Sequence, residues 1–167
     1  MAITPTISAV SYLNTIPFVY GLQHADNLRA ELLLAPPADC AKNYIEGKAD
    51  IALLPAAVVP ELKQTNIITD YCIGAVAAVR TVVIMSNTPI GSVKRIWLDA
   101  HSRTSVQLSG YLAQNKWHIT PEWLHMADYA VVDHAVEGDA FLLIGDKVFD
   151  YEGKFKYSYD LALEWRE

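Results

Sequence analysis

Short apolar runs alternate with amphipathic stretches along the first half of the chain. Residues 6–10 (Thr-Ile-Ser-Ala-Val) predict a strand, and residues 16–23 predict a helix, because Pro17 is preorganised for a first helical turn. The predicted elements that follow are a strand at 29–35, a helix at 38–45, a strand at 49–55, a helix at 56–63, and strands at 71–76 and 79–86. This alternation is typical of a parallel sheet covered by helices.

The same alternation restarts after residues 87–92 (Asn-Thr-Pro-Ile-Gly-Ser), which form the densest turn signal in the chain. The elements predicted beyond this turn are a strand at 95–98, a helix at 102–115, a strand at 122–125, a helix at 129–136 and a strand at 140–144. We therefore expect an α/β protein of two lobes with a ligand cleft between them. The first lobe is predicted to span 1–88 and the second to span 89–158.

Composition narrows the class of protein. With 167 residues, 52% of them hydrophobic and 19% charged, the chain is expected to fold as a globular protein. The net charge of −6 argues against binding to nucleic acid or to an anionic membrane, since both need a basic face. No apolar run has the length of a membrane span and the N-terminus has no signal-peptide pattern, so we expect a cytoplasmic protein. Cys40 and Cys72 are expected to be reduced, partly buried thiols.

Polar side chains gather at 102–105 (Ser-Arg-Thr-Ser), in the first turn of a predicted helix. Backbone N–H groups are unpaired at that position and the helix dipole is positive, so Ser102, Arg103, Thr104 and Ser105 are candidates to bind a carboxylate or phosphate. The alternative is that Ser102 only caps the helix and Arg103 is a solvated charge. Asp99 and His101, just upstream, favour the functional interpretation.

Further candidates follow the other predicted strands. Asn14 offers one acceptor and two donors without charge, and Tyr12 suits contact with an apolar ring; the alternative for Asn14 is a cap of the helix that follows. Arg80 and Thr81 begin an apolar strand, and alternation leaves open which of them points away from the core. Asp146 follows a buried strand, a common active-site position in α/β proteins, or else caps a helix that begins near residue 147.

The sequence lacks the motifs of several common metal sites and enzyme classes. The five histidines show no H-x-x-x-H or H-E-x-x-H spacing, so no metal site is predicted. No phosphate-binding glycine-rich loop, G-x-S-x-G turn or Cys/His pair is present either. Hydride transfer, phosphoryl transfer and nucleophilic hydrolysis are therefore not favoured.

Four segments together resemble the chorismate dehydratases of the futalosine route to menaquinone, in the order and spacing of that family. They are 10–17 (Val-Ser-Tyr-Leu-Asn-Thr-Ile-Pro), 79–90 with Val-Arg-Thr-Val and Met-Ser-Asn-Thr-Pro-Ile, 102–106 (Ser-Arg-Thr-Ser-Val) and 143–146 (Leu-Ile-Gly-Asp). The resemblance implies a two-lobed fold like type II periplasmic binding proteins. It also implies an enzyme that removes water from chorismate, giving 3-[(1-carboxyvinyl)oxy]benzoate, and it implies no cofactor.

By the same resemblance, Asn14 lies in the active site and Thr81 stands where relatives often carry serine. Residues 102–105 match the anion-binding side of the cleft. From their positions in the sequence, we also expect Tyr12, Arg80 and Asp146 to contact the substrate. The substrate has two carboxylates, which suit hydroxyl, amide and helix N-terminal donors. Because its dehydration forms an aromatic ring, the reaction mainly requires an enzyme that orients the substrate and places charged groups around it. We expect a substrate carboxylate or a held water to take the ring proton, while Asn14 and Thr81 assist loss of the hydroxyl.

Relatives in that family continue beyond the residues that match 159–165, returning to the first lobe. Residues 159–167 are therefore expected to begin that return, and the remainder of the return to be missing. Without it, the edge at 80–86 is expected to be unpaired, which would favour a homodimer or strand exchange.

Three alternatives stay open at this point. The first is a non-catalytic module that binds a small anionic solute, since transport receptors share the fold class. The second is the sister enzyme of the same pathway, which acts on cyclised futalosine, although its first-turn sequence differs from Ser-Tyr-Leu-Asn at 11–14. The third is a remnant that binds substrate poorly and only associates with partners.

Overall fold

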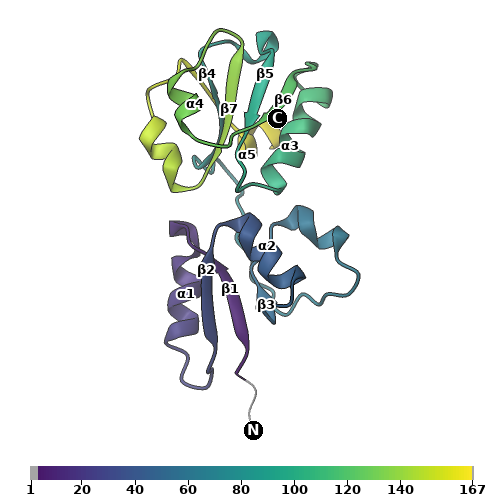
Figure 1. Cartoon of the computed structure of the whole chain (residues 1–167), viewed down its shortest axis with the longest axis vertical. Helices are drawn as coiled ribbons and strands as arrows, with labels where there is room; N and C mark the ends of the chain where they lie inside the picture. Colours follow the sequence, from purple (N-terminus) through teal and green to yellow (C-terminus); the bar gives the residue numbers. More distant parts are fainter. Residues whose placement is uncertain (1–3, 167) are drawn as a thin grey trace. The chain divides into compact units, whose positions relative to one another are not determined.

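The computed structural model describes residues 4–166 and divides into two compact units, Met1–Ile73 and Gly74–Glu167 (Figure 1). The division falls at 73/74 and not at the predicted residue 88. The reason is that residues 82–86 pair with strands of the second unit. None of the helices in the described part of the chain is long and apolar enough to span a bilayer.

The first unit is built on a three-stranded parallel sheet of order β2-β1-β3, in which β1 (Thr6–Val10) lies between β2 (Glu31–Ala35) and β3 (Ile51–Ala52). Helix α1 (Ile16–Gln23) follows β1, and both have the predicted bounds. Helix α2 (Pro37–Ile45) packs on β1, where the Asn43 Nδ2 donates to Ser8 Oγ at 3.3 Å. The central strand is buried from Ile7 to Ala9.

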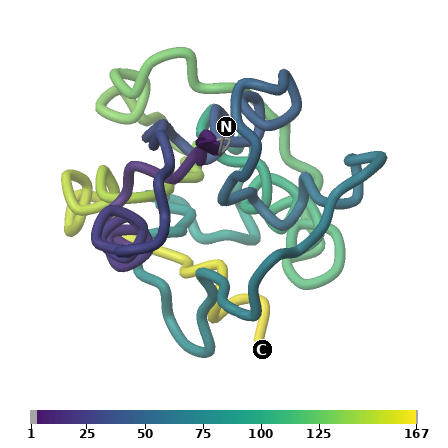
Figure 2. Tube along the Cα trace, turned by 90° about the horizontal axis from the view of Figure 1, so that it is seen from below, coloured from purple at the N-terminus to yellow at the C-terminus, as the bar shows by residue number. Residues whose placement is uncertain are grey.

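Beyond β3 the predicted elements are shorter or absent. The strand expected at 49–55 covers only Ile51–Ala52, and the helix expected at 56–63 is a 3-10 helix, Ala56–Glu61, with Pro60 inside it. Residues 62–81 hold no helix or strand, so the strand predicted at 71–76 is wrong. Apolar residues there have no strand to pair with and remain exposed, Val76 at 88%. In Figure 2 this stretch, blue to teal, follows an uncoiled path.

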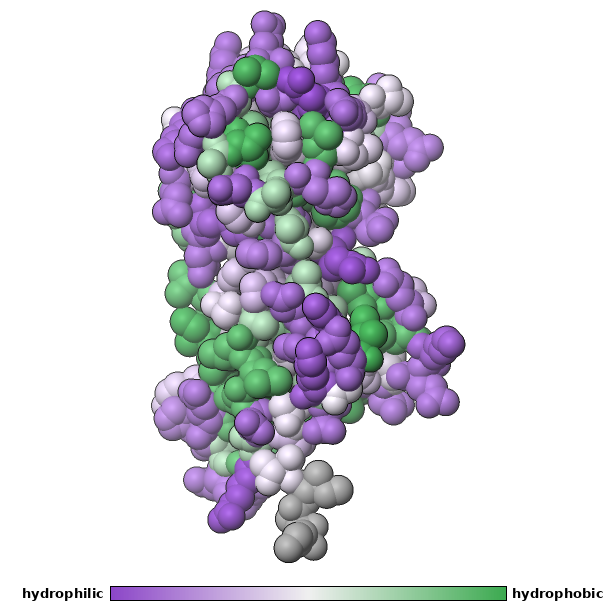
Figure 3. Space-filling model, in the orientation of Figure 1, coloured by the Kyte–Doolittle hydropathy of each residue, from purple (hydrophilic) through white to green (hydrophobic). Residues whose placement is uncertain are grey.

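Apolar side chains also remain on the surface of the first unit. Helix α1 has no buried residue, and Leu13, Ile16 and Tyr20 are all more than half exposed. Figure 3 shows apolar residues gathered over α1 and β2 on the face in view. The first unit therefore has a small core for its length, and we expect it to unfold locally more readily than the second.

This difference predicts where proteolysis begins. Thermolysin, which cleaves before large apolar residues, is expected to cut the native chain first between 62 and 81, where Ile67 is 82% exposed and the backbone lies outside any ladder. Mass spectrometry of early time points would identify the first cut. A first cut inside residues 95–98 or 139–144 would contradict the expectation that the first unit unfolds locally more readily than the second.

The second unit contains a five-stranded sheet of order β6-β5-β7-β4-β8. Its strands are β6 (Glu122–His125), β5 (Arg95–Leu98), β7 (Asp139–Ile144), β4 (Val82–Ser86) and β8 (Tyr157–Asp160). The first three are parallel, whereas β4 runs antiparallel to both β7 and β8. The bounds of β5 and β6 are those predicted from the sequence.

Two hydrophobic clusters lie on the two faces of this sheet. Alternate residues of β7 divide between them, with Ala140 and Leu142 in one cluster and Phe141 and Leu143 in the other, and every residue of β7 is buried. The first cluster includes Leu112 of helix α3 (Thr104–Asn115) and Leu161 of α5 (Leu161–Arg166); the second is covered in part by α4 (Ala130–Asp133).

The edge predicted to be unpaired does not exist. Strand β4 is interior, because β7 covers one side of it and β8 the other, in the register Ile84↔Tyr159. Residues 157–166 thus belong to the second unit, and strand exchange or dimerisation through 80–86 loses its basis. The sequence prediction failed because it placed the partner of β4 in the missing part of the return, whereas β8, at residues 157–160 of this chain, supplies it.

Candidate functional site

A buried carboxylate organises the carboxyl ends of the parallel strands β5 and β7. Asp99 follows β5 directly and is 1% exposed. Its Oδ1 accepts the backbone N–H of His101 at 2.9 Å and the phenol of Tyr129 at 2.7 Å. Its Oδ2 accepts the N–H of Ile144 at 3.2 Å and the Nζ of Lys147 at 2.8 Å. All four lone-pair positions of the carboxylate are therefore occupied.

Lys147 completes this cluster, which we call the Asp99 network: Asp99, His101, Tyr129 and Lys147. Besides Asp99, the Lys147 ammonium contacts the hydroxyl of Tyr129 and lies 3.3 Å from His101 Nδ1. Its Nζ also lies 4.2 Å from the centroid of the Tyr129 ring. An ammonium only donates, so His101 Nδ1 acts as the acceptor and the ring proton is on Nε2. The half-buried His101 thus offers one N–H donor away from the lysine.

Tyr129 and Lys147 were missed as site residues by sequence reasoning. Lys147 carried a weak signal, since it follows Gly-Asp at the end of a buried strand. Tyr129 carried none, because nothing local indicates that its hydroxyl reaches Asp99, 30 residues earlier.

The predicted anion-binding residues 102–105 lie at the same edge. Ser102 is buried, and its N–H donates to the Asp99 backbone carbonyl at 3.1 Å. The N-cap position of α3 belongs to Arg103 and has no side-chain cap hydrogen bond, so the alternative that Ser102 caps the helix is wrong. Thr104 is the first residue of α3 and is exposed, and Ser105 is half-buried.

Thr81 and Asp146 are brought to this edge by the pairing of β4 with β7. The N–H of Gly145 donates to the Thr81 carbonyl at 2.8 Å, one residue beyond the pair Val82↔Ile144. Gly145 has a φ of 74°, a conformation that favours glycine, and turns the chain into the 3-10 helix Asp146–Tyr151. Asp146 is the first residue of that helix and not its N-cap, so the capping alternative is wrong for this residue too.

Arg80 takes a different direction from its neighbour. The strand begins at Val82, so the expected alternation of Arg80 and Thr81 within it does not apply. Arg80 has a φ of 64°, its N–H donates to Asp160 Oδ2 at 2.6 Å, and its Nη2 lies 2.9 Å from Glu152 Oε1. Its guanidinium lines a separate cavity on one face of the sheet.

Asn14 and Tyr12 belong to the first unit, at the carboxyl end of β1. Asn14 is exposed in the single 3-10 turn Leu13–Thr15, and its Oδ1 accepts the Thr15 hydroxyl at 3.3 Å. The N-cap of α1 is Thr15, without a side-chain cap hydrogen bond, so Asn14 does not cap that helix. Tyr12 is half-buried.

The two thiols differ in burial and are both free. Cys40 is fully buried, its Sγ lies 3.4 Å from the Ala35 carbonyl oxygen, and burial raises the pKa of its thiol. Cys72 is exposed, so the expectation of two partly buried thiols is wrong for both residues. Within residues 4–166, no group of three His, Cys, Asp or Glu side chains converges in a way that would hold a metal ion.

Comparison with a protein-family model decides the family. The model described as menaquinone biosynthesis matches residues 5–167. The chain belongs to the menaquinone biosynthesis family. The match covers both units, including the first turn around Asn14 and the edge around Asp99.

Solved structures similar to this family member share its fold. Protein AF1704 from Archaeoglobus fulgidus matches with a TM-score of 0.70 at 19% identity, over 97% of this chain and 62% of that one. The ligand-binding component of an ABC-type import system from Staphylococcus aureus matches with a TM-score of 0.54 at 14% identity, over 95% of this chain and 60% of that one. An ATP phosphoribosyl transferase complex (HisG:HisZ) from Thermotoga maritima matches with a TM-score of 0.51 at 13% identity, over 98% and 90%.

These similarities bear out the two-lobed α/β fold of type II periplasmic binding proteins. The chain spans less than two thirds of the length of the Archaeoglobus and Staphylococcus proteins. A role in menaquinone biosynthesis follows from the family.

Proposed function

We propose that this chain carries the catalytic groups of a chorismate dehydratase, which removes water from chorismate to give 3-[(1-carboxyvinyl)oxy]benzoate. The observation that carries the proposal is the meeting of three segments at one sheet edge. Thr81, residues 102–105 and residues 144–147 are joined there through hydrogen bonds to Asp99 and Gly145. Apart from Lys147, these residues lie in three of the four segments that resemble chorismate dehydratases, and ligands bind at the carboxyl ends of strands in α/β folds.

The donors at this edge suit a dianionic substrate. Ser102, Thr104 and Ser105 supply hydroxyls, and the first turn of α3 supplies backbone N–H groups and the positive end of a 12-residue helix. His101 adds its Nε2–H. We assign a substrate carboxylate to this set, in the role that the resemblance implies for residues 102–105.

Loss of water needs two bonds to break: the ring C–O bond to the hydroxyl and one ring C–H bond. In the net reaction the ring proton and the hydroxyl leave together as one water molecule, and aromatisation of the ring makes the step favourable. Neither Asn14 nor Thr81 is a base at neutral pH, so the ring proton passes to a substrate carboxylate or to a held water. The amide of Asn14 and the hydroxyl of Thr81 stabilise the departing hydroxyl by hydrogen bonding.

Substitution of Asn14 tests this passive role. Asn14→Ala is expected to lower kcat about 100-fold, the cost of removing one transition-state hydrogen-bond donor, with a small change in KM. Asn66→Ala, at an exposed position, serves as the matched control and is expected to leave kcat unchanged. An Asn14→Asp variant that gained activity with a new pH optimum would show that residue 14 acts as a base.

A solute-binding module is the second candidate, and the similarity to the Staphylococcus ligand-binding component favours it. The two functions differ in what happens to bound chorismate. A binding module would be stabilised by chorismate and return it unchanged, whereas the dehydratase would convert it.

A further inference from the structure

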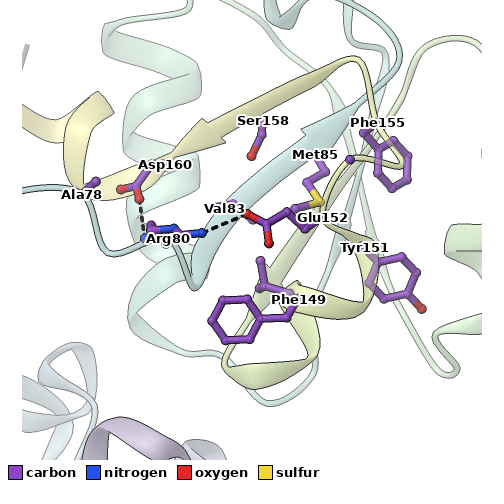
Figure 4. Close-up of a pocket in the computed structure, with 12 residues that line it drawn as sticks. Ala78, Arg80, Val83, Met85, Phe149, Tyr151, Glu152, Phe155, Ser158 and Asp160 are labelled. Carbon is purple, nitrogen blue, oxygen red and sulfur yellow. Dashed lines mark hydrogen bonds and ion pairs between the residues drawn. The ribbon is translucent and has the colours of Figure 1, made fainter.

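A cavity of about 270 Å³ lies in the second unit, on the β4 and β8 side of the sheet (Figure 4). Strand residues Val83 and Met85 form part of its lining, and Val148 and Phe155 add apolar walls. An apolar cavity of about 150 Å³ is enough to hold benzene, so this one has room for an aromatic ring and a polar group attached to it.

Two opposite charges stand at the cavity. The guanidinium of Arg80 and the carboxylate of Glu152 pair at 2.9 Å, and their side chains are 69% and 63% exposed (Figure 4). An ion pair this exposed contributes little to stability, so a ligand can open it at small cost. The rim thus offers one cationic and one anionic group to a ligand.

The backbone holds Arg80 in an unusual conformation at this rim. Its φ of 64° lies in the left-handed region, which disfavours residues with a side chain. Asp160 stabilises it: one carboxylate oxygen accepts the Arg80 N–H at 2.6 Å, and the other accepts the N–H of Ala162 at 2.9 Å at the start of α5. Backbone N–H groups already bind both oxygens of Asp160, whereas Glu152 pairs with the Arg80 guanidinium, so we assign a ligand cation to Glu152.

We propose that this cavity binds an apolar α-amino acid. The ligand's carboxylate pairs with Arg80, its ammonium pairs with Glu152, and its side chain lies against Val83 and Met85. A carboxylate without an ammonium would leave Glu152 beside a second anion, and an amine without a carboxylate would leave Arg80 beside a second cation. The assignment uses no residue of the Asp99 network, and it gives Arg80, expected from the sequence to contact the dehydratase substrate, to this second ligand.

Methyl NMR of the methionines tests the proposal, with L-phenylalanine, 3-phenylpropanoate and 2-phenylethylamine as probes. The Met85 methyl is expected to shift saturably with L-phenylalanine, while Met126, buried on the same face of the sheet, stays in place. Each probe that lacks one charge is expected to bind at least about tenfold more weakly. A Met85 methyl resonance that does not shift at about 10 mM L-phenylalanine would overturn the proposal, and so would 3-phenylpropanoate that binds as tightly as L-phenylalanine.

Variants at the rim separate ligand binding from folding. Arg80→Gln and Glu152→Gln are each expected to weaken L-phenylalanine binding about tenfold or more, with amide spectra that otherwise match the parent. Lys94→Gln removes an exposed charge that does not line the cavity and is expected to change nothing. Unchanged affinity in a folded Glu152→Gln variant would contradict the pairing with the ammonium.

Discussion

Replacing Asp99 with alanine is expected to lower the free energy of unfolding of the second unit by about 3–5 kcal/mol. The carboxylate is 1% exposed and accepts four hydrogen bonds, so its removal leaves the Lys147 ammonium and two backbone N–H groups without their acceptor. Few other single substitutions in this unit would remove so many interactions of one buried group.

Tryptophan fluorescence in urea suits the measurement, because all four tryptophans, Trp97, Trp117, Trp123 and Trp165, lie in the second unit. Asp150→Ala, at an exposed position, is the matched control and is expected to change stability by less than about 0.5 kcal/mol. Coupling is measured by combining Asp99→Ala with Lys147→Met in a double-mutant cycle. An Asp99→Ala variant within about 1 kcal/mol of the parent would show that the network contributes little.

Two replacements of His101 are expected to differ in kcat/KM, because each keeps a polar group near only one of the two ring nitrogens. Glutamine places an N–H donor near the position of Nε2 and is expected to keep most of the activity. Asparagine, whose amide reaches only as far as Nδ1, is expected to lose about 100-fold. The reason is that Nδ1 of His101 accepts from Lys147 Nζ at 3.3 Å, which leaves the ring proton on Nε2.

Nitrogen NMR of the imidazole checks the tautomer without reference to activity. The spectrum is expected to show a protonated Nε2 and an unprotonated Nδ1 in the parent protein, and a mixture of tautomers in Lys147→Met. A protonated Nδ1 in the parent would contradict the donor role of Nε2, whatever the reaction. Glutamine and asparagine variants that both keep the activity of the parent would exclude His101 from substrate binding.

The elements predicted correctly from the sequence are those fixed by local patterns. Helix α1 has the predicted bounds because Pro17 and a turn of polar residues define its start, and β5 and β6 are apolar runs between turn signals. The sequence also indicated a polar stretch at the edge around Asp99, because residues 99–105 follow a buried strand and carry hydroxyl and guanidinium groups.

What could not be predicted depends on partners distant in the sequence. Residues 71–76 have a strand-like composition, yet no strand pairs with them, whereas β4 pairs with residues of β8 that lie 71 to 77 positions later in the chain. Alternation gives the period of a strand and says nothing about its neighbour. For the same reason the sequence did not predict Tyr129 and Lys147 as site residues. Their side chains reach Asp99 only because the fold brings β5 and β7 side by side.

Direct conversion of chorismate is the measurement that tests the central proposal most simply. Purified protein incubated with chorismate is expected to give 3-[(1-carboxyvinyl)oxy]benzoate, detected by its ultraviolet absorbance and its mass, and the Asn14→Ala variant is expected to give far less. Chorismate recovered unchanged, with the protein stabilised against heat by it, would contradict the dehydratase and favour the solute-binding module.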